Sequence, residues 1–274
     1  MSLKKHFLLF AILLVVSLSA QASSIDTLLV RSSSMKKDIQ VMVVVPDVVM
    51  KGGGMSCPVI YLLHGYGGNA GSWLNIKPDL PKIADEKGLI FVCPDGKNGW
   101  YWDSPKNLAY KYETFISSEL VKYVDSHYKT IANRKGRAIT GLSMGGHGAL
   151  WNAFRHHSVF GAVGSTSGGV DIRPFPKNWE MAKQLGELTS NRKLWDDHTV
   201  INQVEHLSDG ELAIIIDCGL NDFFLEVNQN FHQCLVNKKI SHDFILRPGA
   251  HDGSYWNNSI DYQILFFQKY FKKQ

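Results

Sequence analysis

Residues 138–148 read Ala-Ile-Thr-Gly-Leu-Ser-Met-Gly-Gly-His-Gly. They place Ser143 within the pattern Gly-x-Ser-x-Gly, directly after an apolar run and directly before a helix-forming stretch. A nucleophile at the tip of a tight strand-to-helix turn has a strained backbone, so the positions two residues away from it must lack bulky side chains. Gly141 and Gly145 meet this requirement, and the stretch predicts a strand, a sharp turn that carries a nucleophilic Ser143, and a helix.

Apolar strand-like runs and helical patterns alternate along the rest of the chain. This alternation predicts an α/β fold with a mostly parallel sheet that is covered by helices on both faces. Residues 169–208 interrupt it with prolines and short helical pieces, and they form either a lid over a site or a surface excursion. The expected strands are 24–32, 38–46, 59–63, 89–93, 137–140, 161–165, 212–217 and 241–246, and the expected helices are 80–87, 113–128, the stretch after Ser143, 223–237 and 260–270.

The first 22 residues have the pattern of a signal peptide. Lys4 and Lys5 precede an apolar core from Phe7 to Leu18, which is followed by Ala20-Gln21-Ala22. An apolar core of about twelve residues is short for a bilayer span, so we expect cleavage after Ala22 and no stable membrane insertion afterwards. The chain is then exported to the periplasm or the extracellular space, with one domain over residues 23–274.

Charge and cysteine spacing point away from several classes of protein. Without Lys4 and Lys5, the 29 basic residues become 27 against 25 acidic ones, and they are scattered, which argues against a nucleic-acid partner. The four cysteines fit no metal motif, and we expect no metal and no cofactor. Export permits disulfides, but free thiols are favoured because a chain of this length can bury a core without them.

Four chemistry-bearing segments each follow an expected strand. In a parallel sheet, catalytic groups gather at the carboxyl ends of the strands, so these segments are expected to meet at one edge. They supply a serine, an acid and a histidine in that chain order, each on a separate loop. The segments are residues 64–68, residues 141–145, residues 218–222 and residues 248–251.

A serine nucleophile needs a base and an acid that orients the base. His251 is the expected base, because it lies in a glycine-bearing loop after the last strand. Asp222 is favoured as the acid over Asp217, since the acid must reach across a loop to the histidine. The alternatives are a helix N-cap for Asp222 and a bracing role for Asp217.

Backbone amides can stabilise the negative charge that develops on an ester oxygen during attack. The amide of Met144, at the start of the helix, is one expected donor. The other comes from residues 64–68, with Tyr66 favoured and Gly67 as the alternative. His64 is interpreted as structural beneath this loop, and His147 as a packing residue one turn into the helix.

These motifs together resemble the esterase D branch of the α/β-hydrolases. That branch includes carbohydrate esterase family one (feruloyl and acetylxylan esterases), the S-formylglutathione hydrolases and the secreted mycolyltransferases. The resemblance implies Ser143, Asp222 and His251 as the catalytic triad, and the amides of Tyr66 and Met144 as the oxyanion hole. It covers most of residues 36–272 and rests on residues 61–68, 141–146, 217–219 and 222–224, and on His251 with Tyr255-Trp256.

Aromatic residues near the expected site predict part of the substrate pocket. Trp102 lies in residues 99–104, after another strand end, so its ring is expected to contact substrate, as are Gly67, Asp103 and Trp256. Packing of a long loop explains the same rings equally well.

The resemblance and the leader together imply an exported serine esterase that forms an acyl-enzyme, with acetyl or feruloyl esters on plant polysaccharide as substrates. One alternative is a thioesterase like the S-formylglutathione hydrolases, which the leader opposes because that substrate is intracellular. A second alternative is acyl transfer to a sugar. A non-catalytic binding module is disfavoured by the intact set of three catalytic residues, and the oligomeric state stays open.

Overall fold

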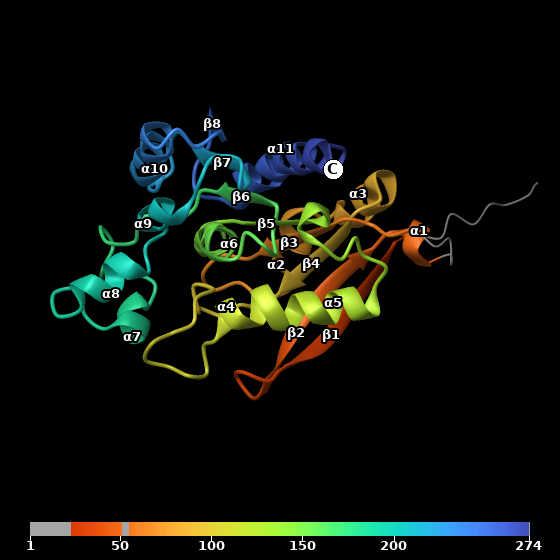
Figure 1. Ribbon diagram of the computed structural model, residues 1–274, viewed down its shortest axis with the longest axis horizontal. Helices are drawn as coiled ribbons and strands as arrows, with labels where there is room; N and C mark the ends of the chain where they lie inside the picture. Colours follow the sequence, from red (N-terminus) through yellow and green to blue (C-terminus); the bar gives the residue numbers. More distant parts are fainter. Residues whose placement is uncertain (1–22, 51–54, 274) are drawn as a thin grey trace, which may run out of the picture.

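The computed structural model describes residues 23–50 and 55–273. The expected signal peptide, residues 1–22, lies outside the described residues. Within them, the chain forms an eight-stranded sheet in the order β1-β2-β4-β3-β5-β6-β7-β8 (Figure 1). The strands are β1 (Ser24–Ser32), β2 (Lys37–Val45), β3 (Val59–Leu63), β4 (Ile90–Pro94), β5 (Arg137–Gly141), β6 (Ala162–Thr166), β7 (Ala213–Gly219) and β8 (Asp243–Arg247).

Strand β2 runs antiparallel to both of its neighbours, β1 and β4, and the other pairs are parallel. All five residues of β3 are buried, as expected for a strand covered on both faces. Its side chains alternate, so that Tyr61 and Leu63 enter one core while Ile60 and Leu62 enter the other. The predicted α/β class and mostly parallel sheet are confirmed.

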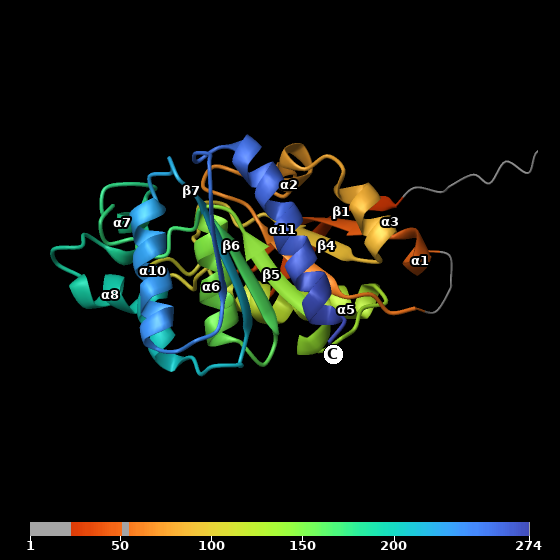
Figure 2. The same cartoon turned by 90° about the horizontal axis from the view of Figure 1, so that it is seen from above.

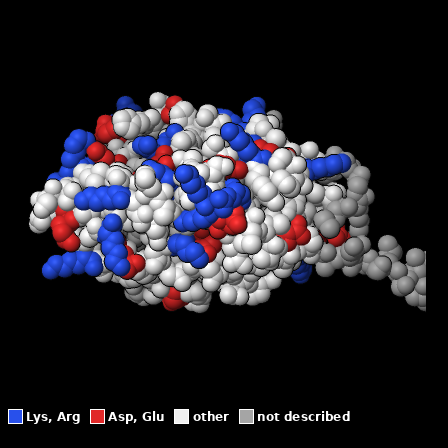
Figure 3. All heavy atoms as spheres, turned by 90° about the horizontal axis from the view of Figure 1, so that it is seen from below, with Lys and Arg blue, Asp and Glu red and all other residues white. Residues whose placement is uncertain are grey.

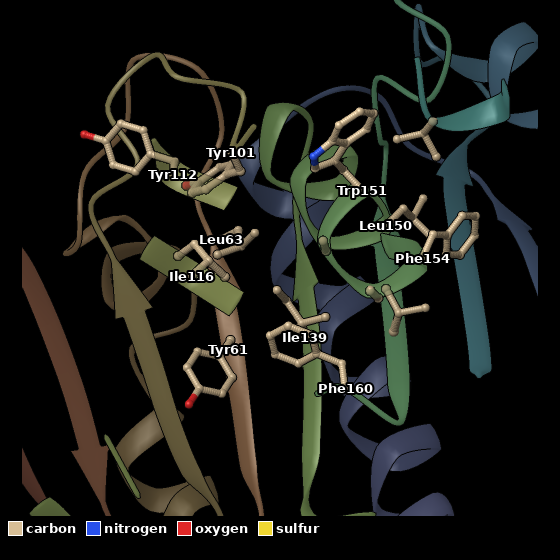
Figure 4. Close-up of a cluster of buried hydrophobic side chains, with 14 of the residues drawn as sticks. Tyr61, Leu63, Tyr101, Tyr112, Ile116, Ile139, Leu150, Trp151, Phe154 and Phe160 are labelled. Carbon is tan, nitrogen blue, oxygen red and sulfur yellow. The ribbon is translucent and has the colours of Figure 1, made fainter. Parts of the chain in front are cut away.

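Helices cover both faces of this sheet (Figure 2). Helices α2 (Ser72–Ile76), α3 (Leu80–Lys87) and α11 (Gly253–Phe271) bury apolar residues in the core on one face. The core on the other face contains side chains of α5, α6 and α10, and Figure 4 shows part of it, including Leu150, Trp151 and Phe154 of α6. The remaining helices are α1 (Asp47–Met50), α4 (Tyr112–Thr114), the π-helix η1 (Phe115–Leu120), α5 (Val121–His127), η2 (Arg134–Gly136), α6 (Met144–Arg155), α7 (Met181–Leu185), α8 (Arg192–Asp197), α9 (Val200–Gln203), η3 (Val204–His206) and α10 (Leu225–Asn237).

Residues 169–208 contain α7, α8 and α9, and Figure 1 shows α7 and α8 at the end of the molecule far from β1. Met181, Leu185 and Trp195 of this segment are fully buried and belong to the core on the α6 side. The segment is therefore packed onto the domain through its own apolar side chains.

Two further properties bear on partners. Among the described residues, no helix is both long and apolar enough to cross a membrane. On the face drawn in Figure 3, basic and acidic side chains are interleaved.

Candidate active site

Ser143 lies between β5 and α6 with φ +55° and ψ −117°, a conformation that a non-glycine residue rarely adopts. The glycines on either side are required by close backbone contacts. A Cβ atom at position 145 would lie 2.2 Å from the carbonyl oxygen of Leu63, and one at position 141 would lie 2.4 Å from the carbonyl of Gly145. The amide of Ser143 donates to the carbonyl of Thr166 at 3.0 Å, which holds the turn against β6.

Ser143, His251 and Asp222 form one hydrogen-bonded chain. The distance between His251 Nε2 and Ser143 Oγ is 2.9 Å, and His251 Nδ1 lies 2.9 and 3.0 Å from the two carboxylate oxygens of Asp222. Because an ionised carboxylate only accepts hydrogen bonds, Nδ1 carries the proton and the Nε2 lone pair faces the serine hydroxyl. The Asp222 side chain is fully buried, and its Oδ1 also accepts from the Phe224 amide at 2.8 Å.

Asp217 serves a different purpose from Asp222. Its buried carboxylate accepts hydrogen bonds from Ser259 and Gln263 of α11, and it lies 3.4 Å from the guanidinium of Arg247. Burial raises the pKa of this carboxyl. Asp217 thus links β7 to α11, which agrees with the bracing role considered for it.

Two backbone amides are available to a substrate oxygen near Ser143. Met144 is the first residue of α6, so its amide has no acceptor within the helix. In the loop of residues 64–68, the Gly67 amide donates to Asn98 Oδ1 at 2.9 Å, so of the two expected donors, Tyr66 and Gly67, it is Gly67 that already has an acceptor. The Gly96 amide donates to His64 Nε2 at 2.9 Å, so His64 lies beneath the loop as expected.

His147 takes no part in this chain of hydrogen bonds. It is fully buried, and its two ring nitrogens lie 3.2 Å from the carbonyl oxygens of Trp100 and His198. Burial lowers the pKa of His147 to about 4, so the ring is neutral at physiological pH. These observations agree with a packing role.

A pocket of about 460 Å³ opens over Ser143, a size typical of small-molecule sites. Aromatic rings form much of its wall. Trp179 stacks on Phe223 with ring centroids 5.8 Å apart, and Trp256 meets the His251 ring edge-on at 5.1 Å. The lining residues are Gly65, Tyr66, Gly67, Gly68, Ser72, Ile76, Leu142, Ser143, Trp179, Phe223, His251 and Trp256.

Of the expected substrate contacts, Gly67 and Trp256 line this pocket, but Trp102 and Asp103 do not. Trp102 is fully buried, where it stacks on Trp100 with centroids 5.9 Å apart. The carboxylate of Asp103 accepts from the amide and hydroxyl of Thr114 at 2.9 and 2.6 Å. The expectation that Trp102 and Asp103 contact substrate is therefore corrected. The Trp102 ring packs in the core, and the Asp103 carboxylate is bound to Thr114.

Trp179 and Phe223 were not singled out as substrate contacts from the sequence. Phe223 directly follows Asp222, the last residue of the third segment, so its position near the site could have been inferred. Trp179 lies in residues 169–208, where the sequence gives no indication of which side chain points inwards.

A larger cavity of about 810 Å³ lies elsewhere, between η1, α5 and the end of α6. The carboxylate of Glu113, on its wall, accepts hydrogen bonds from Trp151, Arg155 and His156, each at 2.8 Å. No serine–histidine hydrogen bond is found among the described residues that line it. The hydrogen-bonded chain of Ser143, His251 and Asp222 thus lies at the smaller pocket and not at this cavity.

The described residues include no group of three or more His, Cys, Asp or Glu side chains that could hold a metal ion. Cys57, Cys93, Cys218 and Cys234 are all free thiols.

Comparison with known proteins gives the family. The family model described as "Putative esterase" matches residues 32–267. The chain belongs to this esterase family. The esterase is 26% identical over 215 residues to an acetyl esterase from Caldicellulosiruptor saccharolyticus, which covers 73% of this chain and 79% of the relative. It is 27% identical over 225 residues to an S-formylglutathione hydrolase from Bos taurus, which covers 73% and 78% of the two chains.

Among solved structures, a ferulic acid esterase matches the esterase with a TM-score of 0.79 at 28% identity, covering 91% of this chain and 99% of the other. The expected relationship to acetyl and feruloyl esterases and S-formylglutathione hydrolases is confirmed, as is the α/β-hydrolase fold. The protein is a carboxylic ester hydrolase.

Proposed function

We propose that the protein is an exported serine esterase in which Ser143, His251 and Asp222 form the catalytic triad. The observation that carries this proposal is the 2.9 Å contact between His251 Nε2 and Ser143 Oγ at the floor of an open pocket. A base within hydrogen-bond reach of the nucleophile, itself oriented by a buried carboxylate, is the arrangement that activates serine.

The reaction follows from this geometry in two halves. His251 Nε2 takes the hydroxyl proton while Ser143 Oγ attacks the ester carbonyl, and the amides of Tyr66 and Met144 stabilise the resulting oxyanion. Collapse of the tetrahedral intermediate breaks the bond to the alcohol, which leaves with the proton from His251. Water, deprotonated by His251, then attacks the acyl-enzyme. The second tetrahedral intermediate collapses as His251 returns the proton to Ser143 Oγ, which releases the carboxylic acid and free Ser143.

The aromatic wall of the pocket supports acetyl or feruloyl esters on plant polysaccharide as substrates. A planar phenolic acid or a sugar ring can stack on Trp179, Phe223 or Trp256, since both present flat apolar faces. The similarity to a ferulic acid esterase and an acetyl esterase supports the same substrates.

The similarity to an S-formylglutathione hydrolase supports a second candidate, a thioesterase. Glutathione carries two free carboxylates, which a dedicated site would pair with cations. The residues that line the pocket include no lysine or arginine, which favours an uncharged ester. Acyl transfer to a sugar would use the same triad, with a sugar hydroxyl in place of water.

The catalytic role is tested with Ser143→Ala. Hydrolysis of p-nitrophenyl acetate should be lost while the circular dichroism spectrum and Tm stay unchanged, and Ser126→Ala, at an exposed helical serine, should keep full activity. Unchanged turnover by Ser143→Ala would reject the proposal. Methyl ferulate, acetylated xylooligosaccharide and S-formylglutathione, compared at matched concentrations with and without a sugar acceptor, separate the candidate substrates.

Export is tested separately, by determining the N-terminus of the chain recovered outside the cytoplasm. A chain that begins at Ser23 is expected, because Ala20-Gln21-Ala22 precedes it. Recovery of an intact chain that begins at Met1 and remains in the cytoplasm would contradict export.

A further inference from the structure

The segment after β4 holds the loop of residues 64–68 through three hydrogen bonds. Two of them act at the buried base of the loop, where Gly96 N–H donates to His64 Nε2 at 2.9 Å and Tyr101 O–H donates to the His64 carbonyl at 3.2 Å. The third acts at the exposed tip, where Gly67 N–H donates to Asn98 Oδ1 at 2.9 Å. Asn98 is therefore the side chain that holds the exposed tip of the loop, and this tip lines the same pocket as Ser143.

A turn hydrogen bond from Gly68 N–H to the Gly65 carbonyl at 3.1 Å closes this loop, and Gly67 has φ +76° with no neighbouring atom within 4 Å of a Cβ position. Beyond this turn, the bond from Gly67 N–H to Asn98 Oδ1 is the contact that orients the Gly67 amide. This amide and that of Tyr66 are adjacent donors, and either could turn towards a substrate oxygen. Once Gly67 N–H is bound to Asn98, the peptide plane after Tyr66 is fixed, and rotation of the plane that carries Tyr66 N–H is restricted.

Asn98 is itself held by residues 169–208. The Asn98 backbone carbonyl accepts from Gln184 Nε2 at 3.3 Å, and Asn98, Glu180 and Gln184 line one small cavity. Trp179 and Glu180 have φ +49° and +56°, a left-handed conformation that strains the backbone of a non-glycine residue and persists where surrounding contacts impose it. This strained pair thus places Trp179 in the pocket wall and Glu180 against Asn98.

We propose that Asn98 is a positioning residue for the oxyanion hole, and that Glu180 and Gln184 hold it in place. Asn98 Oδ1 accepts the hydrogen bond of the Gly67 amide, so that from this loop the Tyr66 amide alone is left to face the reacting carbonyl. The inference rests on the proposed function, because it takes Tyr66 and Met144 as the oxyanion donors. Asn98 does not line the pocket over Ser143, so its effect passes through the loop.

The test compares Asn98→Ala with Asn98→Asp in hydrolysis of p-nitrophenyl acetate. Removing a donor from an oxyanion hole lowers kcat by about 10²–10³-fold, and loosening one should cost about 10–100-fold. We expect Asn98→Ala to lower kcat and kcat/KM equally, with KM unchanged, and to weaken inhibition by a boronic acid, whose tetrahedral adduct on serine places an oxygen in the hole. Asn98→Asp keeps the acceptor for Gly67 N–H but places a second carboxylate beside Glu180, so it is made together with Glu180→Gln, which removes the like-charge repulsion. This double variant should retain kcat within about threefold of Glu180→Gln alone.

Asn69→Ala is the matched control. Asn69 Oδ1 also accepts a hydrogen bond from a backbone amide between β3 and α2, that of Gly71 at 2.8 Å. Its loss tests whether removing any asparagine-to-backbone hydrogen bond in this segment lowers activity. We expect Asn69→Ala to keep wild-type kcat and boronic acid affinity. The inference is overturned if Asn98→Ala keeps wild-type kcat, or if Asn98→Asp in the Glu180→Gln background loses as much activity as Asn98→Ala.

These outcomes are separable from failure of the proposed function, because that proposal depends on Ser143→Ala alone. Should Asn98→Ala not fold, the isosteric Asn98→Asp in the Glu180→Gln background decides the question: kcat near that of Glu180→Gln supports the acceptor role, and a further loss of about tenfold or more rejects it.

Discussion

Asp217 and Asp222 are five positions apart along one strand and the loop that follows it, yet their surroundings give them different roles. Asp222 faces His251 Nδ1, whereas Asp217 faces Ser259, Gln263 and Arg247. Position along the strand could be read from the sequence and favoured Asp222 as the acid. The partners of Asp217 could not be predicted from the sequence, because Ser259 and Gln263 belong to α11, which is distant in the chain.

Asp222→Asn should lower kcat by about 10⁴-fold with little change in KM, since the amide no longer holds the histidine tautomer that activates serine. Steady-state kinetics on p-nitrophenyl acetate measures this. Asp217→Asn is the paired variant: it leaves the Arg247 guanidinium without its counter-charge, so Tm should fall while kcat of the folded enzyme stays within about fivefold. Equal losses of kcat in both variants would contradict the assignment.

Trp179 and Trp102 form a second contrast at the residue scale. Trp179→Ala removes one ring of the pocket wall, so KM for methyl ferulate should rise by about tenfold, the effect of losing one aromatic contact, while hydrolysis of p-nitrophenyl acetate changes little. Trp102→Ala should instead lower the free energy of unfolding by about 3–5 kcal/mol, because its ring is fully buried. A larger rise in KM for methyl ferulate in Trp102→Ala than in Trp179→Ala would instead support the original expectation that Trp102 contacts substrate.

Among the elements, the strand-to-helix turn at Ser143 was the most predictable, because the turn leaves no room for a side chain at positions 141 and 145 and both are glycine. Gly145→Ala should abolish folded, active protein, since the new Cβ would lie 2.2 Å from the Leu63 carbonyl oxygen. Yield and Tm of the purified variant measure the effect. Gly253→Ala, at the start of α11, adds a Cβ with nothing within 4 Å and should be neutral. A stable, active Gly145→Ala variant would refute the steric argument.

Element boundaries and loop paths were harder to predict from sequence. Helix α11 begins at Gly253 and not at residue 260, because Asp252 caps it by accepting the Tyr255 amide at 2.9 Å. The path of the loop with Trp102 depends on φ values of +55° at Trp100 and +61° at Tyr101. No pattern of residues in the sequence predicts these backbone angles. The periodicity of apolar residues thus predicts which segments form strands. The direction of aromatic side chains in the loops between strands depends on single backbone angles, which the sequence does not give.

For the whole molecule, Glu113 links α4 to α6 in the core beside η1. Burial alone would raise the pKa of Glu113, but hydrogen bonds from His156, Arg155 and Trp151 outweigh it and lower the pKa to about 2, from 4.5. A depressed pKa means that this contribution to stability is present above pH 4.5 and is lost as the pH falls towards 2.

Glu113→Gln should therefore cost about 3 kcal/mol of unfolding free energy at neutral pH, and the difference from wild type should shrink as the pH falls below 4.5. Urea denaturation at a series of pH values measures it. Glu86→Gln, which removes an exposed partner of Lys82, should change stability little at any pH. A difference for Glu113→Gln that is independent of pH would contradict the ion-pair account.

Strand β8 lies at the edge of the sheet and has no fully buried residue, whereas β5 and β6 are buried throughout. The loop that follows β8 carries His251. Partial opening of a protein begins where few apolar contacts hold the chain, so fraying of this edge would separate His251 from Ser143 while most of the sheet persists. Loss of ester hydrolysis should therefore precede loss of far-ultraviolet circular dichroism in a urea titration, which makes enzyme activity an early reporter of local unfolding.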